Sequence, residues 1–156
     1  MDYLILKWLH IISSTILFGT GLGSAFYKYV TDRTNNIHAI AETNKIVVLA
    51  DWIFTTPTII IQPITGYLLV TRSGFSLTDS WLVLSVFLFI LTGLCWIPVV
   101  FLQIKMRNLS IIASQANISL PASYYRYTKV WFYLGIPAFI AMLGIFYLMS
   151  NKPVFF

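Results

Sequence analysis

Apolar residues dominate four long stretches of this chain, and polar residues gather in the segments between them. The stretches cover about residues 3–29, 46–71, 80–102 and 130–149. A helix crosses a bilayer with about 20 mainly apolar residues, so each stretch is long enough to span it. The pattern predicts an all-α, polytopic membrane protein that forms a single four-transmembrane-helix bundle over residues 1–156.

The amino-acid composition supports a membrane protein. Hydrophobic residues make up 58% of the chain and charged residues 10%, whereas soluble domains carry about 45–50% apolar and about 25% charged residues. This excludes a soluble globular domain and a disordered chain. Cys95 is the only cysteine, so no intrachain disulfide and no thiolate metal cluster can form. The net charge of +5 does not indicate nucleic acid, because basic residues gather in the cytoplasmic loops of membrane proteins.

The ends of the apolar stretches carry further signals. Little positive charge precedes the first stretch, so we expect a retained helix and not a cleaved signal peptide. Asn35 or Asn36 can cap a helix that runs into the second stretch, and residues 108–115 continue the helical pattern of the third. We therefore expect the second and third helices to extend into the cytoplasm. Aromatic residues near the start of the fourth predict an interfacial belt: Tyr124, Tyr125, Tyr127, Trp131 and Tyr133.

The distribution of Lys and Arg predicts the orientation of the bundle. Seven of the ten basic residues lie toward the two segments that join helix 1 to helix 2 and helix 3 to helix 4, and three lie toward the other ends. Lys and Arg favour the cytoplasmic side of a membrane. We therefore expect a multi-pass protein of the bacterial cytoplasmic (inner) membrane, with both termini on the outer, periplasmic side.

A polar stripe runs along one face of the predicted second helix. At 100° per residue its members fall within a narrow arc: Asp51, Thr55, Thr58, Gln62 and Thr65. Lipid cannot satisfy these side chains, so we expect the stripe to face protein or a cavity. Two interpretations stay open, namely hydrogen bonds between helices and a polar path for a proton.

The predicted first helix carries two special faces. One face combines small and polar residues with a histidine: His10, Ser13, Ser14, Gly21 and Ser24. The nearly opposite face carries Thr15, Gly19 and Gly23, small residues that let another backbone approach closely. We therefore expect helix 1 to contact protein on both sides, which favours a homo-oligomer or a subunit of a larger complex.

Two ionisable residues that are candidates for a functional site, His10 and Asp51, are expected at different depths in the membrane. His10 is expected about two turns below the outer surface and Asp51 one or two turns from the cytoplasmic surface. The two side chains should not touch, and Gln62 and Thr65 are the polar helix-2 residues nearest His10 in depth. Asp51 is expected either to relay protons or to form an interfacial salt bridge with one of three cations: Lys28, Lys105 or Arg107.

His10 is the only histidine within a predicted span, because His38 lies in a cytoplasmic segment. This excludes a bis-histidine haem and a multi-histidine metal site within one chain. Two interpretations remain. His10 either forms a buried hydrogen bond to a neighbour or serves as the single axial ligand of a haem iron, with room for the macrocycle beside Ser13, Ser14 and Gly21.

Several segments resemble a bacterial family of predicted four-helix integral membrane proteins of unknown function. The resemblance lies in LKWLHII at residues 6–12, GTGLG at 19–23, DWIFTTP at 51–57, QPITG at 62–66 and WIPVVFLQIKMR at 96–107. These segments come from the first three predicted helices, and the resemblance covers nearly the whole chain. It implies the same four-helix membrane fold.

That family is in turn similar to the HemJ-type protoporphyrinogen oxidases, which are membrane proteins of four to five helices that bind haem b. His10 matches their haem-ligating histidine, and Pro57 and Gly66 match a proline and a glycine of their second helix. The chain lacks their essential third-helix lysine after Trp81 and Leu82. The resemblance therefore implies haem b bound through His10 but does not carry over the oxidation of protoporphyrinogen.

Three functions stay open at this stage. The first is a haem-dependent membrane oxidoreductase or electron-transfer protein that works with a quinone or a redox partner protein. Its pocket would hold His10 as the ligand of the iron, together with Ser13, Ser14, Gly21, Gln62 and Thr65. The second is a small proton-linked transporter component in which Asp51 relays the proton. The third is a non-haem scaffold subunit of a membrane complex.

The orientation is testable by cysteine labelling from each side of the membrane. Seven positive charges lie toward the predicted cytoplasmic side and three toward the outer side. We therefore expect cysteines placed at either terminus to react only with reagent on the outer side. A cysteine at the joint between helices 3 and 4 should react only from the cytoplasm. Labelling of the C-terminus from the cytoplasm would overturn the predicted topology.

Overall fold

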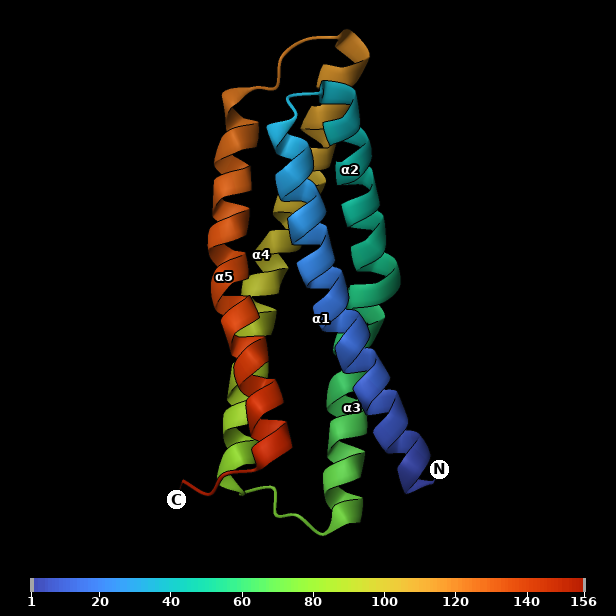
Figure 1. The fold of residues 1–156 in the computed structure, drawn as a ribbon, viewed down its shortest axis with the longest axis vertical. Coiled ribbons are helices and arrows are strands. Elements are labelled where there is room, and N and C mark those ends of the chain that lie inside the picture. Colours follow the sequence, from blue (N-terminus) through green and yellow to red (C-terminus); the bar gives the residue numbers. More distant parts are fainter. Residues whose placement is uncertain (1, 156) are drawn as a thin grey trace.

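The computed structural model describes residues 2–155 as an elongated bundle of helices (Figure 1). The elements follow one another as α1 (Tyr3–Arg33), α2 (Ile37–Ala50), η1 (Asp51–Thr55), α3 (Thr56–Ser73), α4 (Ser80–Ala116) and α5 (Ala122–Asn151). Both termini lie at one end, which we call the terminal end. The opposite end, where α1 joins α2 and α4 joins α5, is the loop end.

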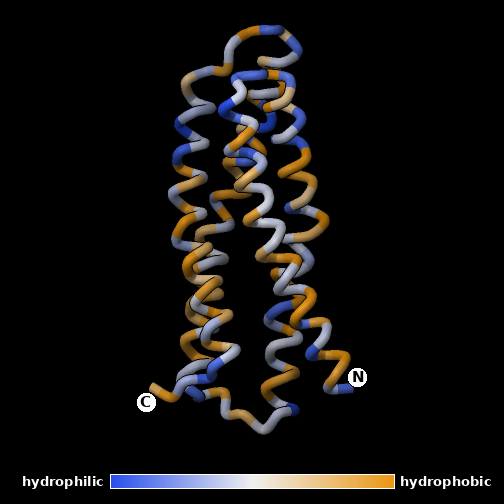
Figure 2. Tube along the Cα trace, viewed as in Figure 1, coloured by the Kyte–Doolittle hydropathy of each residue, from blue (hydrophilic) through white to orange (hydrophobic). Residues whose placement is uncertain are grey.

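Four continuous helical segments, which we call rods, are long and apolar enough to cross a membrane. This confirms the predicted fold class. The elements α2, η1 and α3 form one continuous rod of 37 residues, Ile37–Ser73, and α4 has the same length. Such a helix measures about 55 Å, well beyond the hydrocarbon core of about 30 Å. The helices α1 and α5, with 31 and 30 residues, also exceed the core. Hydrophobic residues fill the middle of the bundle and hydrophilic ones concentrate toward its ends (Figure 2).

The predicted start of the second rod is confirmed at Asn36. Its side-chain oxygen accepts hydrogen bonds from the backbone N–H groups of His38 at 3.1 Å and Ala39 at 3.2 Å. These N–H groups have no partner within the helix itself, so the cap satisfies them. The rod begins at Ile37 and continues without a break through the predicted second span.

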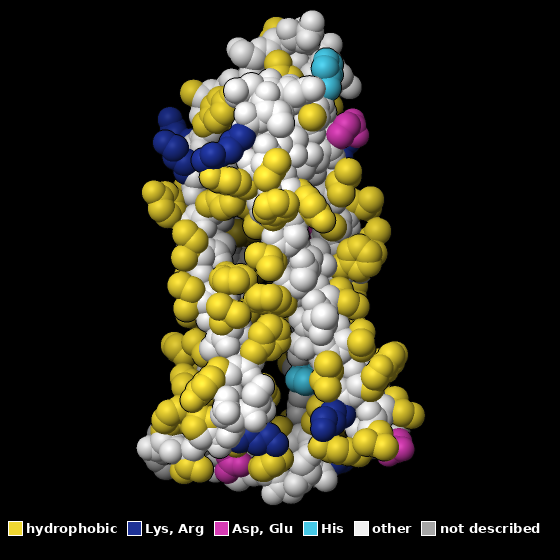
Figure 3. Space-filling model, viewed as in Figure 1, with side chains coloured by type: hydrophobic (Ala, Val, Ile, Leu, Met, Phe, Trp, Pro, Cys, Tyr) yellow, Lys and Arg dark blue, Asp and Glu magenta, His cyan; other side chains and the backbone are white. Residues whose placement is uncertain are grey.

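The surface and the interior are reversed relative to a soluble protein. Large apolar side chains such as those of Ile60, Leu94 and Ile140 are exposed around the middle of the rods. Hydrophobic side chains cover much of the face in Figure 3. Polar side chains lie inside, among them Gln62 and Gln103. This arrangement suits a lipid surround, which accepts apolar atoms and offers polar atoms no partner.

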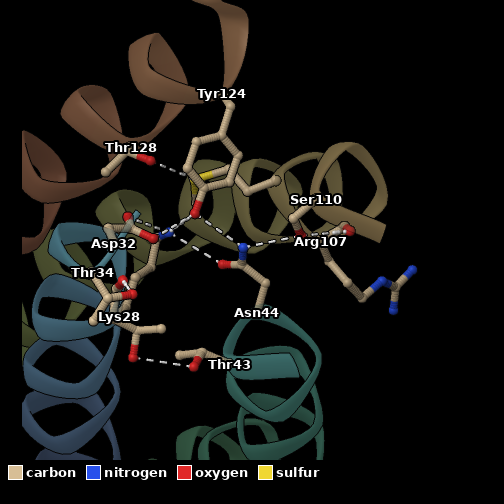
Figure 4. Close-up of polar contacts among 11 residues, drawn as sticks. Lys28, Asp32, Thr34, Thr43, Asn44, Arg107, Ser110, Tyr124 and Thr128 are labelled. Carbon is tan, nitrogen blue, oxygen red and sulfur yellow. Dashed lines mark hydrogen bonds and ion pairs between the residues drawn. The ribbon is translucent and has the colours of Figure 1, made fainter. Parts of the chain in front are cut away.

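A buried polar network joins the helices at the loop end (Figure 4). The ammonium group of Lys28 is fully buried. It donates to the phenol oxygen of Tyr124 at 2.7 Å and to the side-chain oxygen of Asn44 at 3.2 Å, and it pairs with Asp32 at 2.9 Å. Asn44 in turn donates to Ser110 at 3.1 Å. The network therefore ties α1, α2, α4 and α5 together.

The burial of two aromatic residues near this end corrects one sequence-based expectation. Tyr124, which we expected in an interfacial aromatic belt, is fully buried, and Trp131 is buried as well, whereas Tyr125 and Tyr133 are exposed. The phenol of Tyr124 satisfies Lys28 and donates to Asp32 at 2.7 Å. Tyr124 therefore lies at the centre of an interior network. A buried ammonium and a partly buried carboxylate need hydrogen bonds in addition to their mutual attraction.

Within one chain, only one of the two special faces of α1 contacts protein, so the contact expected on the opposite face stays a prediction. Ser13 and Ser24 on the polar face are buried, but Thr15 and Gly19 on the opposite face are exposed, and Gly23 is partly exposed. The nearest side-chain atom to a methyl group added at Gly23 belongs to Tyr27 of the same helix, at 3.7 Å. A single chain therefore leaves the small-residue face of α1 uncovered.

Replacing Tyr124 with phenylalanine should weaken the loop end of the bundle. The Tyr124→Phe variant leaves Lys28, Asn44 and Asp32 without one partner each, so we expect a loss of about 1–3 kcal/mol in stability. Tyr125→Phe is the matched control, because Tyr125 is the next residue along the chain and is itself 48% exposed. The midpoint of thermal unfolding in detergent should fall for Tyr124→Phe alone. Equal midpoints for the two variants would contradict the stabilising role of this network.

Candidate functional site

The polar stripe of the second rod faces the interior of the bundle. Each of its five members is at most 8% exposed: Asp51, Thr55, Thr58, Gln62 and Thr65. This confirms that the stripe faces protein. Its two halves have different surroundings: Gln62 and Thr65 bond to α1, whereas Asp51 and Thr55 border a cavity.

The half nearer the terminal end is joined to α1 by hydrogen bonds. The side-chain amide of Gln62 donates to the hydroxyl of Ser13 at 2.6 Å and to the backbone carbonyl of His10 at 2.8 Å. The ring of His10 meets the hydroxyl of Thr65 at 2.8 Å. The expected match in depth between His10 and this pair of stripe residues is confirmed. For Gln62 and Thr65, the interpretation as interhelical hydrogen bonding is confirmed too.

The contact with Thr65 determines which ring nitrogen of His10 carries the proton. The Thr65 hydroxyl has one proton, and the oxygen lies 2.7 Å from the backbone carbonyl of Ile61, which has only lone pairs to offer. On this geometry we assign the hydroxyl proton to the bond with Ile61 and the ring proton to Nδ1 of His10, which then donates to the Thr65 oxygen. In the neutral ring this assignment leaves Nε2 with a free lone pair.

The ring of His10 borders a large cavity at the terminal end. This terminal cavity has a volume of about 630 Å³ and takes side chains from α1, α3, α4 and α5; Figure 3 shows a hollow in this region of the surface. The hydrogen bond to Thr65 is made by Nδ1, and Nε2 lies on the other side of the ring. The walls are mainly apolar and aromatic, and they include Trp81 and Phe89, while Lys7 and Lys152 add two cations.

A glycine on α3 lets the imidazole pack this closely. A methyl group added at Gly66 would lie 3.3 Å from Cε1 of His10, which is tighter than an ordinary carbon contact. The ring of His10 is therefore held between the Thr65 hydroxyl and the Gly66 backbone. Sequence reasoning noted Gly66 only through the resemblance, and the spacing to Thr65 gave no sign of its contact with the ring.

The predicted haem-site residues divide between two cavities. His10, Ser14 and Gln62 line the terminal cavity, and Ser13 lies behind it on Gln62. Thr65 likewise supports His10 from behind. Gly21 lies elsewhere, on a second cavity of about 330 Å³ that we call the central cavity. It is 11 residues beyond His10, or about 16 Å along the helix axis, so the structure does not bring Gly21 to His10.

Asp51 lies on the central cavity and is buried. One carboxylate oxygen accepts from Thr55 at 2.8 Å, and the other oxygen has no hydrogen-bond partner among the described residues. The expected salt bridge is wrong for residues 2–155: Lys28 pairs with Asp32, and Lys105 and Arg107 form no ion pair with Asp51. The expected separation of Asp51 from His10 is confirmed, since they line different cavities.

The backbone is irregular where Asp51 lies. The rod widens into a π-helical turn, η1, and the Thr56 hydroxyl donates to the Asp51 carbonyl at 3.0 Å. Pro57 follows and has no N–H to donate, and the Thr58 hydroxyl supplies a donor to the Phe54 carbonyl at 2.8 Å. Such π-turns frequently mark functional sites in helices. Within residues 2–155, no three His, Cys, Asp or Glu side chains gather as a metal site would require.

Comparison with known proteins identifies the family of this chain. Residues 4–153 match the family described as predicted integral membrane protein (DUF2269), and the chain belongs to it. No curated protein and no solved structure matches the chain significantly. The resemblance to a membrane-protein family of unknown function is thereby confirmed, and the similarity to the HemJ type stays a prediction.

The assignment of the His10 proton is testable by removing its acceptor. Thr65→Val keeps the shape of the side chain but loses the oxygen, so the two neutral forms of the ring should become more evenly populated at a cost of about 1 kcal/mol. Thr71→Val is the control, because the Thr71 hydroxyl is exposed and bonds only to its own helix. Nitrogen-15 shifts of labelled histidine at alkaline pH report the protonated nitrogen. A wild-type ring protonated at Nε2 would contradict the assignment.

Proposed function

We propose that this member of the DUF2269 family binds haem b in the terminal cavity through Nε2 of His10 and takes part in membrane redox chemistry or electron transfer. The observation that carries the proposal is the fixed imidazole. The Thr65 hydroxyl holds Nδ1 at 2.8 Å, which leaves the Nε2 lone pair for a metal. Histidines that bind metals nearly always donate their other N–H group to such a partner.

The side chains around the terminal cavity fit this group. A cavity of about 630 Å³ with aromatic walls offers flat apolar contact, and Lys7 and Lys152 offer positive charge for the two propionates. Haem when bound supplies a one-electron iron couple whose potential depends on its ligands and on its burial. The bundle residues keep the imidazole in place: Gln62 holds the His10 backbone, and Gly66 gives the ring its room.

A second histidine of the same chain would not hold a haem in the terminal cavity. His38 is at the loop end, where its ring meets the Ser114 hydroxyl at 2.7 Å. We therefore propose a five-coordinate or weakly six-coordinate iron in one chain. If two chains meet along α1, a haem shared by two copies of His10 becomes the arrangement to test.

Electrons would enter and leave the proposed haem through another molecule. A membrane quinone or a redox partner protein would serve, in the bacterial inner membrane and with the terminal end on the periplasmic side. Oligomerisation through the uncovered face of α1 belongs to the same proposal. A non-haem scaffold is the alternative, and it needs none of the His10 geometry.

The proposal predicts that His10→Ala abolishes haem binding while His38→Ala does not. The physical reason is that only His10 presents a free ring nitrogen to the terminal cavity. Protein produced with ample haem should show a Soret band in the wild type and in His38→Ala. Spectra of the oxidised and reduced forms would report the coordination number. A colourless wild-type protein would refute haem binding and favour the scaffold.

A further inference from the structure

The central cavity is a second, partly open space at mid-height in the bundle. Its volume is about 330 Å³, and it lies between α1, η1, α4 and α5. The walls are largely apolar and aromatic, with Leu17, Phe18, Phe132 and Phe139 among them. A space of this size at hydrocarbon depth suits an apolar molecule with a small polar part.

Three residues of its wall each leave a buried polar atom without a hydrogen bond. These atoms are a carboxylate oxygen of Asp51 and the indole nitrogens of Trp96 and Trp131. They are the only such side-chain atoms within residues 2–155. Trp96 and Gln103 lie close to the Asp51 carboxylate, yet neither completes a hydrogen bond to that oxygen. A buried polar atom without a partner costs about 1–3 kcal/mol. The side chains of Trp96 and Gln103 reduce this cost for Asp51, so the indole nitrogen of Trp131 is the atom of this wall that most needs an oxygen from a ligand.

The chemistry of the wall selects the kind of ligand. An indole nitrogen can only donate, so Trp96 and Trp131 call for acceptor oxygens, and the carboxylate of Asp51 can accept from a hydroxyl. No Lys or Arg is among the described residues that line the cavity. An anionic head group would therefore meet a carboxylate with no compensating charge, which excludes phospholipids and fatty acids. A neutral ring that carries carbonyl or hydroxyl oxygens meets every requirement.

The cavity opens toward the lipid between α1 and α5. Gly21 and Leu22 on α1, and Gly135 and Ile136 on α5, line it and are exposed. A methyl group added at Gly21 or Gly135 would meet nothing within 4 Å, so these glycines leave a gap between the two helices. A lipid-soluble molecule can enter sideways without leaving the hydrocarbon.

We infer that the central cavity binds the head group of a membrane quinone, with the oxidised ring accepting from Trp96 and Trp131 and the reduced ring donating to Asp51. The aromatic walls stack against the flat ring, and the tail leaves through the opening between α1 and α5. The redox use of this ligand rests on the proposed function, but its binding does not. Leu17 and Met142 line both cavities, so the two sites are neighbours.

The test compares two glycines of α1 that differ in one respect. Gly21 and Gly19 are both exposed and both have space for a side chain, but only Gly21 lines the central cavity. Haem-free full-length protein in detergent is titrated with decylubiquinone, and quenching of the protein fluorescence is followed. We expect saturable quenching in the wild type and in Gly19→Phe, and a midpoint at least about tenfold higher in Gly21→Phe, because the phenyl ring fills the entrance.

A second pair of variants tests the polar contact without filling the cavity. Trp131→Phe should raise the midpoint roughly five- to tenfold through loss of one hydrogen bond. Trp8→Phe should leave it unchanged, because Trp8 is 60% exposed and lines neither cavity. This pair decides the question if Gly21→Phe does not fold. Quenching that does not saturate, or equal midpoints within the pairs, would show that water or lipid fills the cavity and would overturn the inference.

The two proposals fail separately. A protein that binds decylubiquinone but never shows a Soret band keeps the quinone site and loses the haem. A protein with a His10-dependent Soret band and no saturable quenching keeps the haem and loses the quinone site. Both outcomes are read from the same preparation, with and without added haem.

Discussion

Polar side chains in the middle of this bundle must find their partners inside the protein, because the surrounding lipid offers none. Two sets of contacts meet this constraint. Near the terminal end, Gln62 and Thr65 on α3 hold His10 on α1. At the loop end, Lys28 and Tyr124 join α1 to α5. These contacts fix the position of α1 at two heights, and the central cavity lies between them, where the constraint is not met from within.

Helical periodicity and bilayer thickness were enough to predict much of this arrangement. The period of 3.6 residues places the stripe from Asp51 to Thr65 on one face, and the opposite directions of the first two rods bring His10 level with Gln62 and Thr65. Asn36 could be predicted as a cap because Asn is among the residues that favour that position. Each of these inferences depends on a single helix or on two consecutive helices. The structure confirms each of them.

Contacts between helices that are distant in sequence could not be predicted in this way. Lys28 and Tyr124 are 96 residues apart, and each fits a simpler role in the sequence, as a cytoplasmic charge and as an interfacial aromatic residue. Asp51 has no cation beside it because Lys28 pairs with Asp32, four residues further along the same helix. Gly21 shares a helical face with His10 but lies about three turns away, and only the positions of α4 and α5 show that a second cavity occupies that height.

The two cavities differ in charge as well as in height, and this difference separates the molecules that they suit. The terminal cavity has Lys7 and Lys152 at its margin and lies toward an end of the bundle, where water can hydrate charged groups. The proposed haem, a macrocycle with carboxylate edges, would suit this position, because a charge is costly at the centre of a bilayer. The central cavity has a carboxylate and no cation in its described wall, and it opens to hydrocarbon. Only a neutral molecule can reach it from the lipid without a large desolvation cost. Because Leu17 and Met142 form part of both walls, a neutral redox carrier at mid-depth and a charged cofactor near the surface would lie close enough to exchange electrons while each stays in the medium that suits its charge.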